Sequence, residues 1–304
     1  MLTPGIHDIP MADYLADPCP EPSLSSGCAH RLLTRSPLHA WAEHPRLGGR
    51  SGGDSNASDK GSVAHDMLLG GEGKICVIDP ADYRSKPTKD DPDGAIPKGW
   101  TNGAIRSARD MARGNGLTPI LAAEYGAVRK MADVARQFLN TTELAGVLDS
   151  GKPEQTLIWQ EGPTWFRARP DWLTNSGDVM LHYKTTEASA NPAPFIRGLL
   201  PGMGYDVSLA FYRRGWKALG GSHETLHVIL VQEQSAPYAC SLVALSPVML
   251  AIAEEKVERA IDTWASCMKT RRWPAYSPAI HYAEPTAWQL AEAEAALQGR
   301  GCES

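Results

Sequence analysis

The chain has 304 residues, of which 42% are hydrophobic and 21% charged, and a formal net charge of −5. This composition is typical of a globular protein with material for one large domain or two modest ones. The charge argues against a protein that coats nucleic acid through its overall field, and no segment resembles a signal peptide or a membrane span. Six scattered cysteines without a C-x-x-C pair indicate no zinc or iron–sulfur site. We therefore expect a soluble, cytoplasmic protein with reduced thiols.

The first part of the chain predicts short helices separated by an irregular loop. Residues 22–44 contain serines suited to helix capping and are interrupted at Pro37, which predicts two short helices. Residues 46–61 mix glycine, serine and charge without a hydrophobic period, which predicts an exposed flexible loop. Residues 61–71 and 122–140 have helical periodicity. Between those helices, residues 83–100 are rich in proline and charge and are expected to form a mobile surface segment.

From residue 155 onward the pattern changes to that of strands. Strands are predicted at residues 155–160, 164–173, 178–184, 225–232 and 238–245. Helices are predicted at residues 202–219, from Pro247 to residue 269, and in the tail after residue 283. This order predicts an α/β (α+β) fold in which a mixed sheet is covered by helices.

Polar side chains gather at the end of the third predicted strand. Because side chains alternate along a strand, His182 and Lys184 face the same side, about 7 Å apart. Asp171 lies at the end of the preceding predicted strand. If the two strands pair, the three side chains converge at one end of the sheet.

The motif RPDWL followed by LHYK resembles the PD-(D/E)xK nuclease superfamily. Together with GSVAHDMLLGG, YKTTEAS, GYDVSLAFYRRG and VQEQSAPYACSLVALSP, it resembles the RecE-like phage and prophage exonucleases, which are related to the C-terminal domain of exodeoxyribonuclease VIII. The resemblance extends from about Ser23 to Tyr276. It implies a single nuclease-like domain with a restriction-endonuclease-like core at 61–276, N-terminal helical additions at 1–60 and a helical tail at 277–304.

The resemblance also implies roles for individual residues. His65 and Asp171 match metal ligands, and Lys184 matches the catalytic lysine. Tyr212 matches the tyrosine of a glutamine-x-x-x-tyrosine motif that positions DNA. Two positions depart from the family pattern: His182 stands where an aspartate or glutamate ligand is expected, and Ser208 stands where the glutamine is expected.

The histidine leaves three explanations open. His182 could be a natural metal ligand, the chain could be a natural pseudoenzyme, or the substitution could have been introduced to inactivate it. Histidine reduces the negative charge that attracts Mg²⁺ and suits Mn²⁺ or another transition metal better. We favour a nuclease fold whose activity is weak or absent.

Each candidate residue also has a purely structural interpretation. Glu154 could be a further acidic ligand, although we expect it to lie exposed at the surface. Arg213 and Arg214 extend from the helix of Tyr212 and could bind phosphates, because phosphate contacts supply most sequence-independent affinity for DNA. Alternatively, they belong to a solvated helix end.

The resemblance implies a Mg²⁺- or Mn²⁺-dependent exonuclease that resects linear double-stranded DNA ends 5′-to-3′ and leaves 3′ tails. Its implied partners are DNA ends, a single-strand annealing protein of the RecT type, and further copies of the chain in a ring, in a phage or prophage setting. The alternative is an inactive DNA-end-binding or partner-binding protein with the same fold.

Overall fold

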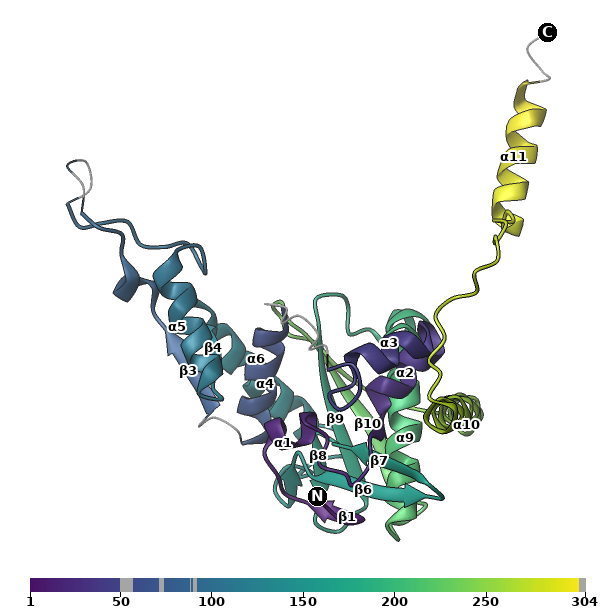
Figure 1. Ribbon diagram of the computed structural model, residues 1–304. Helices are drawn as coiled ribbons and strands as arrows, with labels where there is room; N and C mark the ends of the chain where they lie inside the picture. Colours follow the sequence, from purple (N-terminus) through teal and green to yellow (C-terminus); the bar gives the residue numbers. More distant parts are fainter. Residues whose placement is uncertain (50–56, 71–73, 88, 90–91, 301–304) are drawn as a thin grey trace. The chain divides into compact units, whose positions relative to one another are not determined.

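The computed structural model describes residues 1–49, 57–70, 74–87, 89 and 92–300, with only the backbone at 57–59 and 296–300 (Figure 1). It contains two compact units, Met1–Trp273 and Pro274–Ser304. In the described ranges, no helix combines the length and the apolar character that crossing a membrane requires. Among the same residues, every cysteine is free.

A five-stranded sheet forms the centre of the first unit, in the order β11-β10-β9-β8-β5 (Figure 1). Its strands are β5 (Gly151–Pro153), β8 (Trp172–Thr174), β9 (Val179–Thr186), β10 (Leu226–Glu233) and β11 (Cys240–Ala244). Strands β9 and β10 are parallel, whereas the other neighbouring pairs are antiparallel. The sheet is therefore mixed and flanked by helices, which confirms the predicted fold class.

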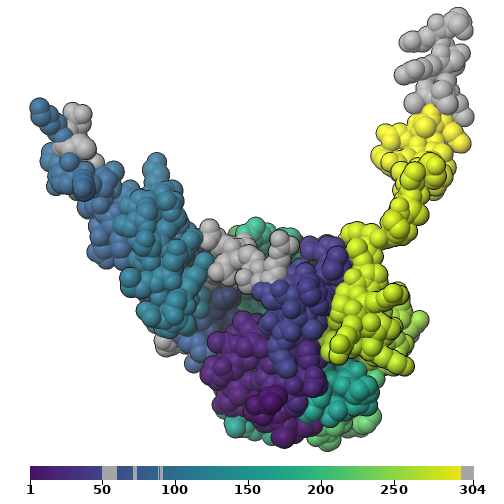
Figure 2. All heavy atoms as spheres, in the orientation of Figure 1, coloured from purple at the N-terminus to yellow at the C-terminus, as the bar shows by residue number. Residues whose placement is uncertain are grey.

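A second sheet of four strands has the order β1-β6-β7-β2. Its strands are β1 (Gly5–His7), β2 (Ser23–Ser25), β6 (Thr156–Glu161) and β7 (Thr164–Ala168). The β6–β7 pair is the predicted hairpin. The N-terminal segment, with α1 (Met11–Leu15), adds β1 to one edge, and its purple residues lie beside the teal strand residues in Figure 2.

The expectation of one continuous strand at 164–173 was wrong. Residues 164–168 form β7 in the second sheet, whereas 172–174 form β8 in the central sheet. Pro170 lies between them, and proline has no N–H to donate to a strand ladder and restricts the residue before it. The break leaves Asp171 at the junction of the two sheets.

Helices cover both faces of the central sheet (Figure 1). On one side lie α4 (Ala57–Leu69) and α6 (Ala122–Asn140), whose apolar residues pack with Leu181 and Tyr183 of β9. On the other side, α9 (Tyr205–Ala218) packs with Met180, together with α2 (Ser26–Thr34) and α10 (Pro247–Thr270). The short α3 (Pro37–Glu43) follows α2, so Pro37 divides two helices as predicted.

Several elements differ from the expected pattern. The loop expected at 46–61 ends earlier, because α4 already begins at Ala57, and the part of that loop at 50–56 lies outside the described residues. Residues 74–121 contain β3 (Ile75–Ile78), a 3₁₀ turn η2 (Pro80–Tyr83), α5 (Gly103–Gly114) and β4 (Thr118–Leu121). The two strands pair in parallel, but four residues are too few for a readable period.

Between β9 and α9 the chain forms short helical turns. They are α7 (Pro192–Pro194), the π-helical η3 (Phe195–Leu199) and α8 (Leu200–Gly202). The second unit contains α11 (Ala287–Arg300), which confirms the helix predicted in the tail.

Candidate active site

The chain break at Pro170 places Asp171 against β9. Strand β8 pairs with β9 so that Trp172 lies opposite Leu181, and the preceding residue, Asp171, therefore lies beside the next residues of β9. The Asp171 Oδ2 atom accepts a hydrogen bond from the Tyr183 backbone N–H at 2.8 Å. A second bond at 2.8 Å comes from the Lys184 Nζ atom. The sequence prediction that Asp171 and Lys184 converge agrees with this geometry.

The charges of this pair stabilise each other. Burial opposes ionisation of Asp171, but the Lys184 ammonium and His65 hold the pKa of the carboxyl well below its usual range. Burial also opposes the charge on Lys184, and the Asp171 carboxylate outweighs this and raises the lysine pKa. Lys184 therefore stays a fixed cation at neutral pH and is suited to stabilise charge on a phosphate rather than to act as a base.

His65 of α4 lies among three carboxylates. Its Nε2 atom is 3.7 Å from Asp171 Oδ1, and its Nδ1 atom is 3.9 Å from both Glu154 Oε1 and Asp66 Oδ1. Burial lowers the histidine pKa, but Asp171 and Asp66 outweigh it and raise the pKa to about 9. The imidazole is therefore protonated at neutral pH, and a cation bound there would have to displace that proton.

Asp66 of this cluster was not predicted as a ligand, and Glu154 was considered as one only as the alternative to a surface residue. Glu154 was expected at the surface, yet its side chain is only 15% exposed, and Oε2 accepts a hydrogen bond from Arg169 at 3.0 Å. The side chain is withdrawn from solvent because it lies among the basic groups of His65, Lys74 and Arg169. Asp66 follows His65 directly, and that adjacency was the only sequence signal for it.

These side chains form a donor set suited to a divalent cation. Ligand atoms of His65, Asp66 and Glu154 all lie within 4.8 Å of one another. Carboxylate oxygens suit Mg²⁺ or Mn²⁺, and an imidazole nitrogen adds a donor that Mn²⁺ accepts more readily. These three residues thus fit a divalent metal ion, whereas Asp171 faces the other ring nitrogen of His65.

His182 occupies a different environment. It is 2% exposed, and its ring stacks on Tyr212 with centroids 4.9 Å apart and planes inclined by 26°. Its buried Nε2 atom has no hydrogen-bond partner among the described residues. Burial lowers the pKa of His182 to about 3, although the nearby Asp171 opposes this shift. His182 is therefore neutral, and one of its ring nitrogens lacks a partner.

The predicted DNA-contacting residues all lie on α9. The hydroxyl of Tyr212 accepts a hydrogen bond from Ser26 at 3.4 Å, and burial together with Asp171 raises its pKa to about 12. Ser208 is half-buried one turn earlier. Arg213 bonds Glu254 at 2.9 Å, and Arg214 pairs with Glu161 at 2.6 Å and with Glu258. Both guanidinium groups thus have carboxylate partners, and their contact with DNA stays a prediction.

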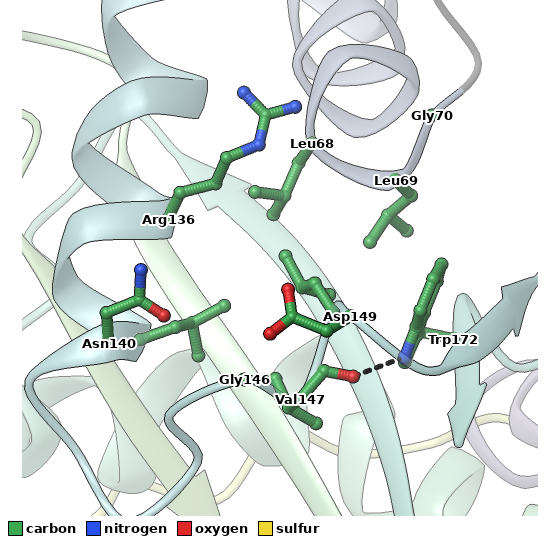
Figure 3. Close-up of a pocket in the computed structure, with 11 residues that line it drawn as sticks. Leu68, Leu69, Gly70, Arg136, Asn140, Gly146, Val147, Asp149 and Trp172 are labelled. Carbon is green, nitrogen blue, oxygen red and sulfur yellow. Dashed lines mark hydrogen bonds between the residues drawn. The ribbon is translucent and has the colours of Figure 1, made fainter. Parts of the chain in front are cut away.

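A cavity of about 290 Å³ lies behind the site, between α4, α6 and β8 (Figure 3). In Figure 3, Trp172 closes one wall and donates its indole N–H to the Val147 carbonyl at 2.9 Å. None of the predicted site residues lines it. Trp172 follows Asp171 in sequence, so alternation along β8 directs its side chain to the opposite face of the strand.

The mixed sheet, the Pro170–Asp171 pair and Lys184 two residues after His182 define a domain of the PD-(D/E)xK nuclease type. The chain belongs to the family described as PDDEXK-like domain of unknown function (DUF3799), whose model matches residues 107–286. That match contains Glu154, Asp171 and Lys184, whereas His65 and Asp66 precede it.

Solved structures support the same fold. The chain is similar to a crystal structure described as a "Putative exonuclease" from Eubacterium rectale, with a TM-score of 0.56 and 10% sequence identity. The similarity covers 93% of this chain and 98% of the other chain. At 10% identity, the similarity between the two chains is evidence of a shared fold alone. No curated protein matches the sequence.

Proposed function

We propose that this chain is a metal-dependent exodeoxyribonuclease that acts on linear double-stranded DNA ends. The observation that carries the proposal is the Lys184–Asp171 contact of 2.8 Å beside the His65, Asp66 and Glu154 donors. A fixed cation beside a bound metal ion can stabilise the charge that develops when water attacks a phosphodiester and the P–O bond breaks. The family membership supports the nuclease class.

In the proposed reaction the side chains have separate tasks. His65, Asp66 and Glu154 would hold a Mg²⁺ or Mn²⁺ ion, which would supply a Lewis acid for the phosphate, while Asp171 faces the opposite ring nitrogen of His65. Asp171 also fixes the Lys184 ammonium in place. Lys184 then stabilises the negative charge that develops on the phosphate oxygens, and its raised pKa keeps it protonated during that step.

The finer function follows the RecE-like resemblance. We propose 5′-to-3′ resection that leaves 3′ tails, a single-strand annealing partner, and a ring-shaped oligomer in a phage or prophage setting. The polarity and the need for an end can be tested with two substrates. One is a linear duplex labelled at its 5′ or its 3′ ends, and the other is a covalently closed circle. Early release of the 5′ label with an intact circle supports the proposal, whereas cutting of the circle would indicate an endonuclease. Sedimentation of the full chain tests the ring.

The second candidate is an inactive DNA-end-binding protein. The burial of neutral His182 against Tyr212 favours it, because the position expected to supply a ligand carboxylate supplies none. The decisive comparison is His182→Asp against the natural chain, each with Mg²⁺ and then Mn²⁺. Cleavage only by the variant supports an impaired nuclease with an otherwise intact site. If neither protein cuts but both bind duplex ends, the end-binding function replaces the nuclease.

A further inference from the structure

A second cavity of about 300 Å³ opens beside Lys184. It lies between the last residues of β9, the helical turns 195–205 and the ends of β10. Lys184 is the one residue of the candidate active site in its wall. The cavity is therefore continuous with the place where a phosphate would meet that ammonium.

The walls of this cavity combine apolar and polar groups. Phe195 and Val231 form a buried apolar floor, and the ring of Tyr205 stacks on Phe195 with centroids 6.0 Å apart. Thr185 and Gln234 lie at one side, where the Gln234 amide donates to Thr185 Oγ1 at 2.9 Å. Within the described part of the chain, the Gln234 side-chain carbonyl makes no hydrogen bond. Apolar walls with a few placed polar groups are typical of small-molecule binding sites.

Tyr205 connects this cavity to the active site. Burial raises the pKa of the Tyr205 phenol, Lys184 lowers it, and Asp171 raises it. Tyr205 and Lys184 also line the same cavity. A ligand that contacts Tyr205 would also lie near the Lys184 ammonium.

Two further cavities among the described residues lack this connection. The cavity of Figure 3 is lined by Arg136 and Asp149. A third, of about 220 Å³, is lined by Arg213 and His227. Neither contains one of the residues around His65, and neither has Lys184 in its wall. One exposed carboxylate, Glu187, does line the cavity beside Lys184, so a neutral group is better suited to its interior than a second phosphate.

Resting on the proposed nuclease function, we propose that this cavity binds one unpaired nucleobase of the DNA strand whose phosphate lies at Lys184. Its volume suits a single base, while a stacked base pair needs an open groove. Stacking on aromatic side chains is sequence-tolerant, because every base has a π face. Tyr205 and Met203 contact the base, and the Gln234 carbonyl accepts from an N–H group on the edge of the base.

The test compares two changes on the same helical turns. Met203, which is 57% exposed, lines the cavity, and Met203→Trp would fill its mouth without touching the active site. Ile196, which is 42% exposed, lies on the same turns outside the cavity, and Ile196→Trp is the matched control. Tyr205→Ala removes the aromatic wall.

The measurement is binding of single-stranded oligonucleotides to the full chain in EDTA, followed by fluorescence anisotropy. One series carries a single abasic site moved along the strand. For the natural chain and Ile196→Trp, we expect one position at which base removal weakens binding about 5- to 150-fold. Met203→Trp and Tyr205→Ala should bind intact DNA more weakly than the natural chain by the same factor. In these two variants, removing the base at the sensitive position should change the affinity less than about twofold.

The outcomes separate this inference from the nuclease itself. An abasic series with no sensitive position, or equal sensitivity in Met203→Trp and Ile196→Trp, would overturn the base-binding cavity even if the chain cleaves DNA. A sensitive position that Met203→Trp abolishes would support it, even if neither the natural chain nor His182→Asp cuts DNA. In that case the cleavage proposal alone fails.

Discussion

Two clusters in the first unit contain the same kinds of groups, a carboxylate, a histidine and a basic side chain. In one, Asp17 accepts bonds from Ser23 N and Oγ at 2.8 and 2.7 Å and lies 3.2 Å from Arg167. The Nε2 atom of His44 lies 3.4 Å from Asp17 Oδ2 and completes this cluster. In the other, Asp171 bonds Lys184 at 2.8 Å, but His65 is 3.7 Å away.

Exposure separates the clusters more sharply than composition does. The side chains of Asp17 and His44 are 0% and 1% exposed, whereas those of His65 and Lys184 are 19% and 32% exposed. A fully buried ion pair can hold segments together but leaves no room for a ligand. In the second cluster, partial exposure and the 3.7–3.9 Å contacts of His65 leave ligand atoms that a cation or phosphate can reach. The first cluster is structural, and the second has the geometry of a binding site.

The largest expected effect is on the structural cluster. Asp17→Asn should lower the free energy of unfolding by about 3–5 kcal/mol, because it leaves Arg167 as a buried charge without its counter-ion. Asparagine tolerates the left-handed backbone of this position (φ 64°), so the change isolates the charge. Urea denaturation measures it, with exposed Asp13→Asn as the control. A loss below about 1 kcal/mol would show that the Asp17 cluster does not stabilise the fold.

The next effect concerns catalysis. Lys184→Ala should reduce the rate of DNA cleavage about 10²- to 10³-fold, or about 2.7–4 kcal/mol in the barrier, because one fixed charge is lost at the phosphate. The rate is measured on linear duplex DNA in whichever background cuts, the natural chain or His182→Asp. Exposed Lys152→Ala should cut normally. An unchanged rate in Lys184→Ala would remove Lys184 from the mechanism.

A third prediction separates the clusters by metal binding. At 100 times its dissociation constant, Mn²⁺ should stabilise the natural chain by about 2.7 kcal/mol. Glu154→Gln should weaken Mn²⁺ binding 10- to 100-fold. At the same Mn²⁺ concentration, the stabilisation by the ion should then fall to about 0.4–1.4 kcal/mol. The measurement is urea denaturation with and without Mn²⁺. Asp17→Asn and exposed Glu143→Gln should keep the full increment, and an equal increment in Glu154→Gln would place the ion elsewhere.

The smallest effect is a pH dependence of the structural cluster. Burial opposes ionisation of Asp17, but His44 and Arg167 outweigh it and hold its pKa below the usual 3.8. Because the folded-state pKa is depressed, the stabilisation is complete above about pH 4 and is lost as the pH falls through the lower folded value. The stability difference between the natural chain and Asp17→Asn should therefore shrink below pH 4. A constant difference down to pH 2 would contradict this assignment.

Local patterns were enough to predict much of this fold. The periodicity of residues 122–140 predicted α6, because the apolar face of a helix repeats within a few turns. Pro247 predicted the start of α10, since proline is favoured in the first turn of a helix. Short strands such as β3 and β4 were missed, since pairing partners more than 40 residues apart stabilise them. The break at Pro170, which places β7 and β8 in different sheets, was missed for the same reason.

The sequence by itself determined the fold class, the helices and the adjacency of His182 and Lys184 on one strand. These follow from side-chain periods that neighbouring residues fix. Tertiary structure decided that Glu154 joins His65 and Asp66, and that His182 is buried against Tyr212. These contacts connect segments between 30 and about 90 residues apart, and their geometry depends on how helices pack on the sheet rather than on any local preference.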